Sequence, residues 1–310
     1  MINCRDLGLL PIPSASILET YRNLLYVAGD DSPWLHVQTV DGAQANQLSL
    51  VPELAEVPLT HRIPKPEKHD LEAGCVLPEG MAGPGAALLL LGSGSTDLRC
   101  VGCLVHLKAD GTPEDEVEWL DNIAPLYDAI NEGREPGSPD SLNLEGLCLY
   151  NGDLLLFNRA LKSSRSLVTI LRATTVVDLG REMLDEEEEM QEVYEQFLQL
   201  PTVNGLVYGV TGATIGPDGL YLTACAEDTG NSYDDGPVLG SQLGFLPFDA
   251  EGYLPDDELW KPTWTPLTTD AGPAGLKLES LAWVKQGNQR RLLAVSDNDA
   301  GESRLWEILR

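Results

Sequence analysis

Short apolar runs, bounded by Gly, Asn or Asp, recur along the chain in groups of three. The clearest groups span residues 144–170 and 278–308, and both begin with Leu-Glu. In each group a polar turn separates the first run from the second, and polar residues follow the second run. Runs with this pattern are typical of β-strands joined in hairpins. The pattern therefore predicts a repeated unit of three short strands.

Three looser copies of the unit begin at residues 15, 71 and 210, which gives five copies in all. A segment after each of the first four copies could supply a fourth strand. These segments are 47–51, 116–120, 174–179 and 259–266. The fifth copy is followed by no such segment, whereas residues 4–10 form an apolar stretch without a partner of its own. We therefore expect residues 4–10 to complete the sheet of the fifth copy.

These features predict an all-β fold, a β-propeller of five blades closed by the N-terminal strand. Radial repetition of four-stranded sheets leaves few unprotected sheet edges. Six blades are an alternative, because the spacing of the copies exceeds the about 40 to 50 residues that one blade usually takes. Two β-sandwich domains are a second alternative. A motif matched in both halves and the lack of a linker favour one domain over residues 1–310.

Two insertions have helical spacing. Residues 121–133 carry apolar side chains three and four positions apart and end at Gly133, a common helix stop. Residues 183–200 carry a longer apolar stripe, and the acidic run 185–189 lies in its first turns, where the helix dipole favours negative charge. We predict a helix in each segment. Metal binding by the acidic run is an alternative, and the second helix could pack on the ring or on another subunit.

Composition narrows the classes of partner. The 310 residues include 49 acidic and 20 basic side chains, a formal net charge of −29, so no cationic face for nucleic acid is expected. No apolar run approaches the about 20 residues that span a membrane. Arg5 and Asp6 stand where a secretory signal needs apolar residues. We therefore expect a cytoplasmic protein without nucleic-acid or membrane partners, and the oligomeric state stays open.

Three glutamates occupy the same place in the repeat. Glu72, Glu145 and Glu279 stand at the start of the first strand, where the other two copies carry Ala15 and Thr211. The innermost strands of a propeller line its channel, so these carboxylates should converge and repel unless protonated or bridged by a cation. Oxygen ligands of this kind suit calcium. The alternative is that they accept hydrogen bonds from backbone N–H groups and hold the blades together.

A second matched set of polar residues follows the middle strand. It comprises Asp30, Asn158, Arg159, Glu227, Asp228 and Asp297. Such residues would gather at one mouth of the channel, a natural binding surface, although Asp and Asn also form turns. Residues 227–242, rich in Gly and Asp, are a candidate flap over that mouth.

The cysteines do not suggest a metal site. Cys100 and Cys103 form a C-x-x-C pair on a predicted strand, and no second pair completes a zinc site. Cys75 and Cys148 share a repeat position and are predicted to be small buried core residues. No nucleophile with an adjacent base can be named, so serine or cysteine hydrolase chemistry has no support.

The sequences Leu-Glu-Gly-Leu at 144–147 and Leu-Glu-Ser-Leu-Ala-Trp at 278–283, with the strand that ends in Ser296-Asp297, resemble a known family. They are similar to the phytase-like and esterase-like β-propeller proteins of bacteria and their uncharacterised relatives. The resemblance implies a propeller and a calcium-dependent hydrolase of phosphate or other esters. The residues that it touches are Glu145, Asn158, Glu279 and Asp297.

The sequence is therefore consistent with two functions. The first is a protein that binds a small molecule or a protein partner at the channel mouth. The second is a metal-dependent esterase or phosphatase, with calcium held by Glu72, Glu145 and Glu279 as a Lewis acid that activates water.

Overall fold

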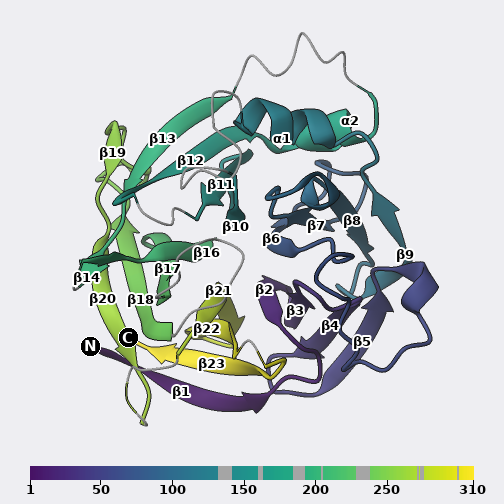
Figure 1. The fold of residues 1–310 in the computed structure, drawn as a ribbon, viewed down its shortest axis with the longest axis horizontal. Helices are drawn as coiled ribbons and strands as arrows, with labels where there is room; N and C mark the ends of the chain where they lie inside the picture. The colour runs from purple at the N-terminus through teal and green to yellow at the C-terminus, as the bar shows by residue number, and fades with distance from the viewer. Residues whose placement is uncertain are drawn as a thin grey trace.

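The structure is a computed structural model that describes residues 1–131, 142–159, 163–183, 193–203, 205–227, 238–270, 272, 276–298 and 300–310. The fold is all-β, with sheets of eight, five, four, four and two strands. The larger sheets are arranged around a common centre, as in a propeller, and two short helices lie at the periphery (Figure 1). Neither of the described helices is long and apolar enough to cross a bilayer.

The first two sheets have four antiparallel strands each, ordered as in the chain. The first sheet comprises β2 (Ala15–Tyr21), β3 (Leu24–Gly29), β4 (Trp34–Thr39) and β5 (Gln44–Ser49). The second comprises β6 (Leu71–Leu77), β7 (Ala87–Gly92), β8 (Gly102–Leu107) and β9 (Pro113–Trp119). Two 3₁₀ turns, Pro52–Leu54 and Asp97–Arg99, lie in the connections of this half.

The third sheet has an extra edge strand. It comprises β10 (Leu144–Tyr150), β11 (Asp153–Asn158), β12 (Arg165–Arg172), β13 (Tyr194–Gln199) and the short β19 (Leu259–Trp260). A two-stranded ribbon, β14 (Thr202–Val203) with β15 (Leu206–Val207), follows it in the chain.

The eight-stranded sheet consists of two antiparallel four-strand runs. One run comprises β16 (Gly209–Ile215), β17 (Gly219–Glu227), β18 (Val238–Pro247) and β20 (Thr263–Thr268). The other comprises β21 (Leu278–Gln286), β22 (Gln289–Asp297), β23 (Ser303–Leu309) and β1 (Ile2–Leu9). A short parallel pairing of β1 with β20 joins the two runs. The antiparallel pairing of β1 with β23 confirms that the N-terminal segment completes the sheet of the last repeat unit.

The first strand of each repeat unit lies nearest the centre. These five inner strands contact one another in a closed cycle, in the order β2, β6, β10, β16, β21 and back to β2. Their placement around the middle of the molecule is visible in Figure 1. Residues near the start of these strands therefore share one small region, although they are far apart in the chain.

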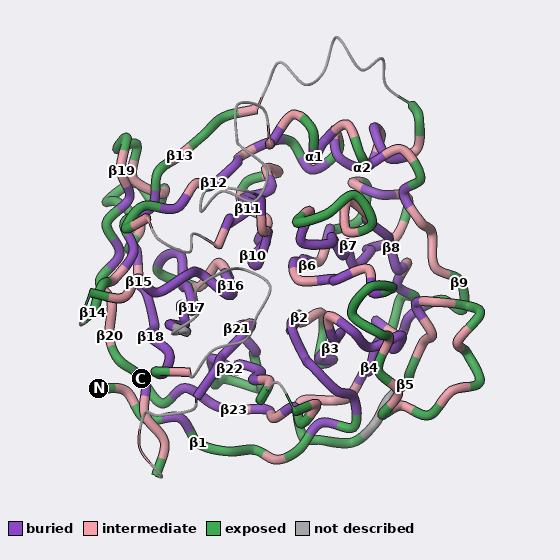
Figure 2. Tube along the Cα trace, in the orientation of Figure 1, coloured by how far each residue is buried: buried purple, intermediate pink, exposed green. Residues whose placement is uncertain are grey.

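The apolar core lies between neighbouring sheets. Leu89 and Leu91 of β7 pack with Leu147 of β10 in one cluster, whereas Cys148, the next residue of β10, packs with the sheet beyond. An inner strand is thus apolar on both faces, which explains its nearly continuous hydrophobic sequence. Buried positions follow the inner strands, and exposed positions follow outer strands such as β1 and β9 (Figure 2).

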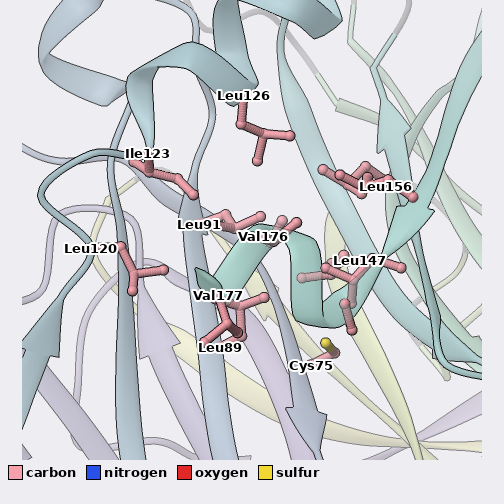
Figure 3. Close-up of a cluster of buried hydrophobic side chains, with 14 of the residues drawn as sticks. Cys75, Leu89, Leu91, Leu120, Ile123, Leu126, Leu147, Leu156, Val176 and Val177 are labelled. Atoms are coloured by element: carbon pink, nitrogen blue, oxygen red, sulfur yellow. The ribbon is translucent and has the colours of Figure 1, made fainter. Parts of the chain in front are cut away.

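Both helices cover the outer side of this core. Helix α1 (Ala124–Asn131) confirms a helix within the predicted range 121–133, whose last two residues lie outside the described part of the chain. Its Leu126 packs into the cluster between the second and third sheets. Helix α2 (Ala173–Gly180) adds Val176 and Val177 to the same cluster (Figure 3).

Two secondary-structure predictions are wrong. Residues 174–179, expected as a fourth strand, lie in α2, because packing of its apolar face outweighs the β-preference of Thr and Val. The helix expected over 183–200 is absent from its described residues, since Tyr194–Gln199 forms β13 and pairs with β12. In β13 Leu198 is buried and its neighbours Phe197 and Gln199 are exposed, as on a strand. The acidic run 185–189 lies outside the described residues.

Candidate functional site

Each inner strand carries a β-bulge near its start. The strand register skips one residue there, and the skipped residues are Ser16, Glu72, Glu145, Thr211 and Glu279. A bulge leaves the extra residue out of the hydrogen-bond ladder and re-aims its side chain. The repeat therefore presents one polar side chain from each inner strand at the same level. The first-copy equivalent is Ser16, and its prediction as Ala15 is wrong because the bulge lies between Ala15 and Ile17.

The two hydroxyl residues of this layer tie inner strands together. Ser16 Oγ donates a hydrogen bond to the carbonyl of Leu71 on β6, at 2.6 Å. Thr211 Oγ1 donates to the carbonyl of Leu278 on β21, at 2.5 Å. The role of holding blades together, considered above for the glutamates, is thus carried by these two hydroxyls.

The three glutamates of the layer act on one another electrostatically. Burial is the largest cause that raises the pKa of Glu72 well above its ordinary value, and the charge of Glu145 adds to it. Burial likewise raises the pKa of Glu145 to about 7, and the charge of Glu279 contributes. Glu145 therefore lies within electrostatic range of Glu279, and Glu72 within range of Glu145.

Basic side chains built into the same layer offset these charges. Lys277 Nζ lies 3.1 Å from Glu279 Oε1, and Arg159 Nη1 lies 3.3 Å from Glu145 Oε1. Glu145 Oε1 also accepts a hydrogen bond from Asn143 Nδ2 at 2.7 Å. Lysine is rarely buried without a charged partner, and Lys277 is only 8% exposed. The layer is therefore a mixed cluster of acids and bases.

Asp70 is the most fully paired acid of the site. Its Oδ1 contacts Lys68 Nζ at 2.6 Å, and its Oδ2 accepts hydrogen bonds from Ser93 Oγ at 2.6 Å and Arg99 Nη1 at 2.8 Å. Its backbone has a φ of 57°, in the left-handed region that non-glycine residues rarely adopt. Both carboxylate oxygens are thus committed to contacts within the protein.

Asp30 shares Lys68 with Asp70 but has a second oxygen that remains available. Its Oδ2 pairs closely with Lys68 Nζ. Burial raises the pKa of Asp30 to about 6, although the charge of Lys68 opposes this shift. Burial opposes the charged form of Lys68, but the charges of Asp30, Asp70 and Glu72 outweigh it and raise the pKa of Lys68. A protonated lysine therefore sits between the first two sheets.

Some buried carboxylate oxygens accept no hydrogen bond from the described part of the chain. Among them are Asp30 Oδ1, Asp31 Oδ1 and Glu279 Oε2. The other oxygen of Asp31 accepts from Arg62 Nε at 2.7 Å. Buried acceptors in folded proteins are normally satisfied, so such oxygens mark a place where a hydrogen-bond donor fits. Asp30 and Glu279 combine this property with membership of the charged cluster.

The site also contains one group that could hold a cation. Ligand atoms of Asp30, Asp70 and Glu72 lie within 4.8 Å of one another. Oxygen donors of this kind are the ligands that calcium prefers. Glu72 is the one member of the predicted glutamate set within this group. The ammonium of Lys68 contacts two of the three carboxylates.

The residues predicted to lie together at the mouth do not all belong to the charged cluster. Arg159 joins the cluster through Glu145, and the charge of Asp297 acts on Arg62, the partner of Asp31. Asn158 Oδ1 accepts from the backbone N–H of Asn143 at 2.6 Å, a contact between residues 15 positions apart rather than the local turn considered for it. Glu227 ends β17, where its backbone pairs with Val238. Asp228 and the centre of the proposed flap, 228–237, lie outside the described residues.

Sequence reasoning named Arg159 but missed Asp70 and the cations Lys68, Arg99 and Lys277. A signal for part of this set stands two positions before each glutamate, where the chain carries Asp70, Asn143 and Lys277 in the pattern X-Leu-Glu. Cys75 and Cys148 stand three positions after Glu72 and Glu145 and are buried, as predicted. In β6 and β10 a polar residue thus stands near the beginning of the strand, and a small buried cysteine follows.

Several solved structures are similar to the chain at low identity. An α-L-arabinofuranosidase from Podospora anserina shares 9% identity at a TM-score of 0.48, covering 99% of this chain and 95% of its own. The Malassezia sympodialis allergen Mala s 1 shares 9% at 0.47, covering 97% and 95%. A Myxococcus xanthus glutaminyl cyclase shares 10% at 0.42, covering 100% and 98%. Similarity at this level carries no information about activity.

Comparison with curated proteins gives no match. Residues 11–309 match the profile of a family of unknown function, DUF6929. This match covers nearly the whole chain, including all five inner strands and the acids and bases at their beginnings. The chain belongs to the DUF6929 family.

Proposed function

We propose that this protein is a five-bladed β-propeller that binds a small polar ligand at the mouth where its inner strands begin. The blade count is supported by the closed cycle of five inner strands, each followed by further antiparallel strands. In this account the eight-stranded sheet is two blades joined at their outer edges by β1 and β20.

One observation carries the binding proposal: buried carboxylate oxygens of Asp30 and Glu279 lack donors among the described residues, inside a cluster of fixed charges. A ligand that brings hydroxyl or amino groups would satisfy both oxygens. Polar groups held in place by neighbouring ion pairs are also preorganised for recognition. The mouth therefore suits a ligand rich in hydrogen-bond donors.

The charge balance favours a neutral or cationic ligand over an anionic one. Arg159 and Lys277 already pair with Glu145 and Glu279, so they offer little uncompensated positive charge. A phosphate group would meet Asp30 and Glu279 at short range and be repelled. We expect polyhydroxylated, amine-bearing or zwitterionic small molecules to bind, and phosphate monoesters to bind far more weakly.

Thermal unfolding in the presence of a compound panel tests the proposal. The panel contains neutral polyols, primary amines, zwitterions and phosphate monoesters. Binding to the native state raises Tm by mass action, so at least one of the first three classes should raise it. Glu279→Gln should abolish that rise because it replaces an acceptor oxygen by an N–H₂ donor.

The matched control is Glu53→Gln, which makes the same chemical change at an exposed position in a 3₁₀ turn. This variant should keep the full rise in Tm. The proposal is contradicted if no donor-bearing class raises Tm, or if Glu279→Gln responds as the wild type does.

A calcium-dependent hydrolase of phosphate or other esters is the second candidate. It is favoured by the oxygen group of Asp30, Asp70 and Glu72. Bound calcium would supply a Lewis acid that polarises an ester or a water molecule. For these residues to hold it, Lys68 must release Asp30 and Asp70, so calcium and the Lys68 ammonium compete.

Calcium titration distinguishes this candidate from the first. Millimolar calcium should raise the wild-type Tm and support hydrolysis of an ester panel, and Glu72→Gln should remove both effects. If calcium leaves Tm unchanged while a donor-rich ligand raises it, the binding function is retained and the hydrolase is rejected.

A further inference from the structure

A cluster of three aromatic rings surrounds a guanidinium group on the side of the molecule where β16, β17, β18 and β21 meet. The Arg310 guanidinium carbon lies 4.5 Å from the ring centroid of Tyr221, 5.3 Å from that of Phe245 and 5.8 Å from that of Trp283. All three distances are within the range of cation–π attraction. We call Tyr221, Phe245 and Trp283, with Asp218 beside them, the aromatic cage.

The rings of the cage are fixed by the sheet. Tyr221 and Phe245 are direct cross-strand neighbours on β17 and β18, with centroids 4.8 Å apart. Trp283, from β21, meets Tyr221 edge-on at 5.2 Å and an interplanar angle of 75°. A Cβ atom at Gly216 would lie 2.4 Å from Trp283 Nε1 and 2.5 Å from a Tyr221 ring carbon. The rings can approach this closely only because a glycine stands there.

The cage also has a polar side. Tyr221 donates a hydrogen bond from its hydroxyl to Asp218 Oδ1 at 2.6 Å, and Asp218 Oδ2 lies 3.8 Å from Arg310 Nη2. Trp283 Nε1 is buried and has no hydrogen-bond partner in the described part of the chain. Aromatic faces beside a carboxylate are the elements that recognise quaternary ammonium and guanidinium groups.

The contacts that hold the Arg310 side chain in the cage can be replaced by those of another cation. It lies one residue beyond β23, whose last ladder pair joins Leu309 to Asn3, so its side chain can leave without breaking a strand pair. Its side chain is 35% exposed and that of Asp218 is 52% exposed. Ion pairs at such exposure contribute little stability.

We propose that the aromatic cage is a binding site for organic cations with delocalised or methyl-shielded charge, and that Arg310 occupies it in the free protein as an internal competitor. Guanidinium and quaternary ammonium groups fit because they lose little hydration when they stack on rings. A compact, strongly hydrated primary ammonium fits less well. The site is separate from the charged cluster at the channel mouth and does not depend on the function proposed there.

Titration of the full-length protein with tetramethylammonium and with L-arginine amide tests this inference. The readout is the indole N–H signal of Trp283 in a two-dimensional nitrogen–proton spectrum, identified among the six tryptophans by its loss in Trp283→Phe. In Arg310→Ala, tetramethylammonium should shift this signal saturably. The apparent Kd should be at least about tenfold lower than in the wild type, because the internal competitor is gone.

Arg304→Ala is the matched control, since Arg304 lies on β23, the strand that Arg310 follows, but pairs with Asp6 and Glu302. It should bind tetramethylammonium as the wild type does. If Arg310→Ala fails to fold, Arg310→Gln, which keeps part of the aliphatic stem over Tyr221, should show the same gain.

Three results would overturn the proposal. The first is a folded Arg310 variant whose Trp283 signal responds to neither cation, which would leave Arg310 as a structural cap. The second is equal affinity in the wild type and the Arg310 variants. The third is undiminished binding after Tyr221→Leu is added to Arg310→Ala, because the cation would then bind elsewhere.

Discussion

Asp70 and Glu279 are both buried acids near the start of an inner strand, yet their surroundings differ. Asp70 Oδ1 forms an ion pair with Lys68, and its Oδ2 accepts hydrogen bonds from Ser93 and Arg99. Glu279 pairs with Lys277 through Oε1, and its Oε2 has no partner among the described residues.

The difference indicates a structural role for Asp70 and a ligand-binding role for Glu279. A carboxylate whose two oxygens are committed cannot accept a further donor without releasing one that it holds. A carboxylate with one unpaired oxygen can accept a donor from a ligand and keep the contacts that it already has. Replacement of each acid by its amide distinguishes the two roles, because an amide keeps one acceptor and turns the other into a donor.

The largest effect is expected for Asp70→Asn. Its N–H₂ group must face either Lys68 or the Ser93 and Arg99 donors, and one buried base loses its counter-charge. Breaking one side of a buried ion pair is strongly destabilising, so we expect a loss of about 3 kcal/mol in the free energy of unfolding. Urea denaturation measures it.

Asp115→Asn is the control for this substitution, since the Asp115 side chain is 93% exposed. It should change the free energy of unfolding by less than about 0.5 kcal/mol. A cost below about 1 kcal/mol for Asp70→Asn would contradict the structural role of Asp70.

The next effect concerns pH. Burial raises the pKa of Asp30 to about 6 and that of Glu145 to about 7, so the folded protein retains these protons to higher pH than the unfolded chain. Stability should therefore fall as the pH rises from about 4.5 to about 7, because the folded protein loses these protons in that range. Glu145→Gln should flatten this slope.

Acids whose pKa is lowered act in the opposite direction at lower pH. The hydrogen bond from Arg181 is the main cause that lowers the pKa of Glu118 to about 2, so its contribution is lost as the pH falls toward that value. Stability should peak near about pH 4.5, where the two trends meet. A profile that rises steadily from pH 5 to 8 would contradict the raised pKa values of Asp30 and Glu145.

A smaller effect on stability is expected for Glu279→Gln. Its amide oxygen can still accept from Lys277, and its N–H₂ group can occupy the open side where Oε2 now lies. We expect a change of about 1 kcal/mol or less in the free energy of unfolding. A loss as large as that of Asp70→Asn would show that both acids have the same structural role.

The smallest effect is expected for Ser16→Ala. This variant removes the hydrogen bond to the Leu71 carbonyl between the first two inner strands and leaves a buried acceptor unsatisfied. The expected cost is about 0.5 to 1 kcal/mol in thermal or chemical unfolding. Ser95→Ala, at a less buried hydroxyl near Arg99, provides the comparison. Equal or smaller cost at Ser16 would remove its bridging role.

Much of the strand pattern could be predicted from the sequence. The repeat identified all five inner strands, and the unpartnered apolar segment identified the strand that pairs with β23. The predictions failed where packing decides between helix and strand. Residues 174–179 have β-branched side chains but form α2, and Tyr194–Gln199 has helical spacing but pairs with β12.

Less of the site could be predicted. The shared repeat position of Glu72, Glu145 and Glu279 predicted that they lie near one another, because repeat position fixes the place of a residue around the centre. The charges of Glu72 and Glu279 do act in pairs with Glu145, but of the three only Glu72 belongs to the oxygen group of Asp30 and Asp70. The first-copy equivalent was misplaced, since a one-residue bulge decides whether Ala15 or Ser16 belongs to this layer. Arg99 was missed because its pairing with Asp70 arises only when separate loops fold together. Lys68 was missed because its pairing with Asp30, 38 positions earlier, likewise arises only on folding.

The most direct test of the account is a crystal structure grown with the donor-rich compound that raises Tm most. We predict ligand density at the mouth, with donor atoms within hydrogen-bond distance of Asp30 Oδ1 and Glu279 Oε2, while Asp70 keeps Lys68, Ser93 and Arg99. The account is contradicted if both oxygens accept hydrogen bonds from the chain itself, with the compound bound elsewhere.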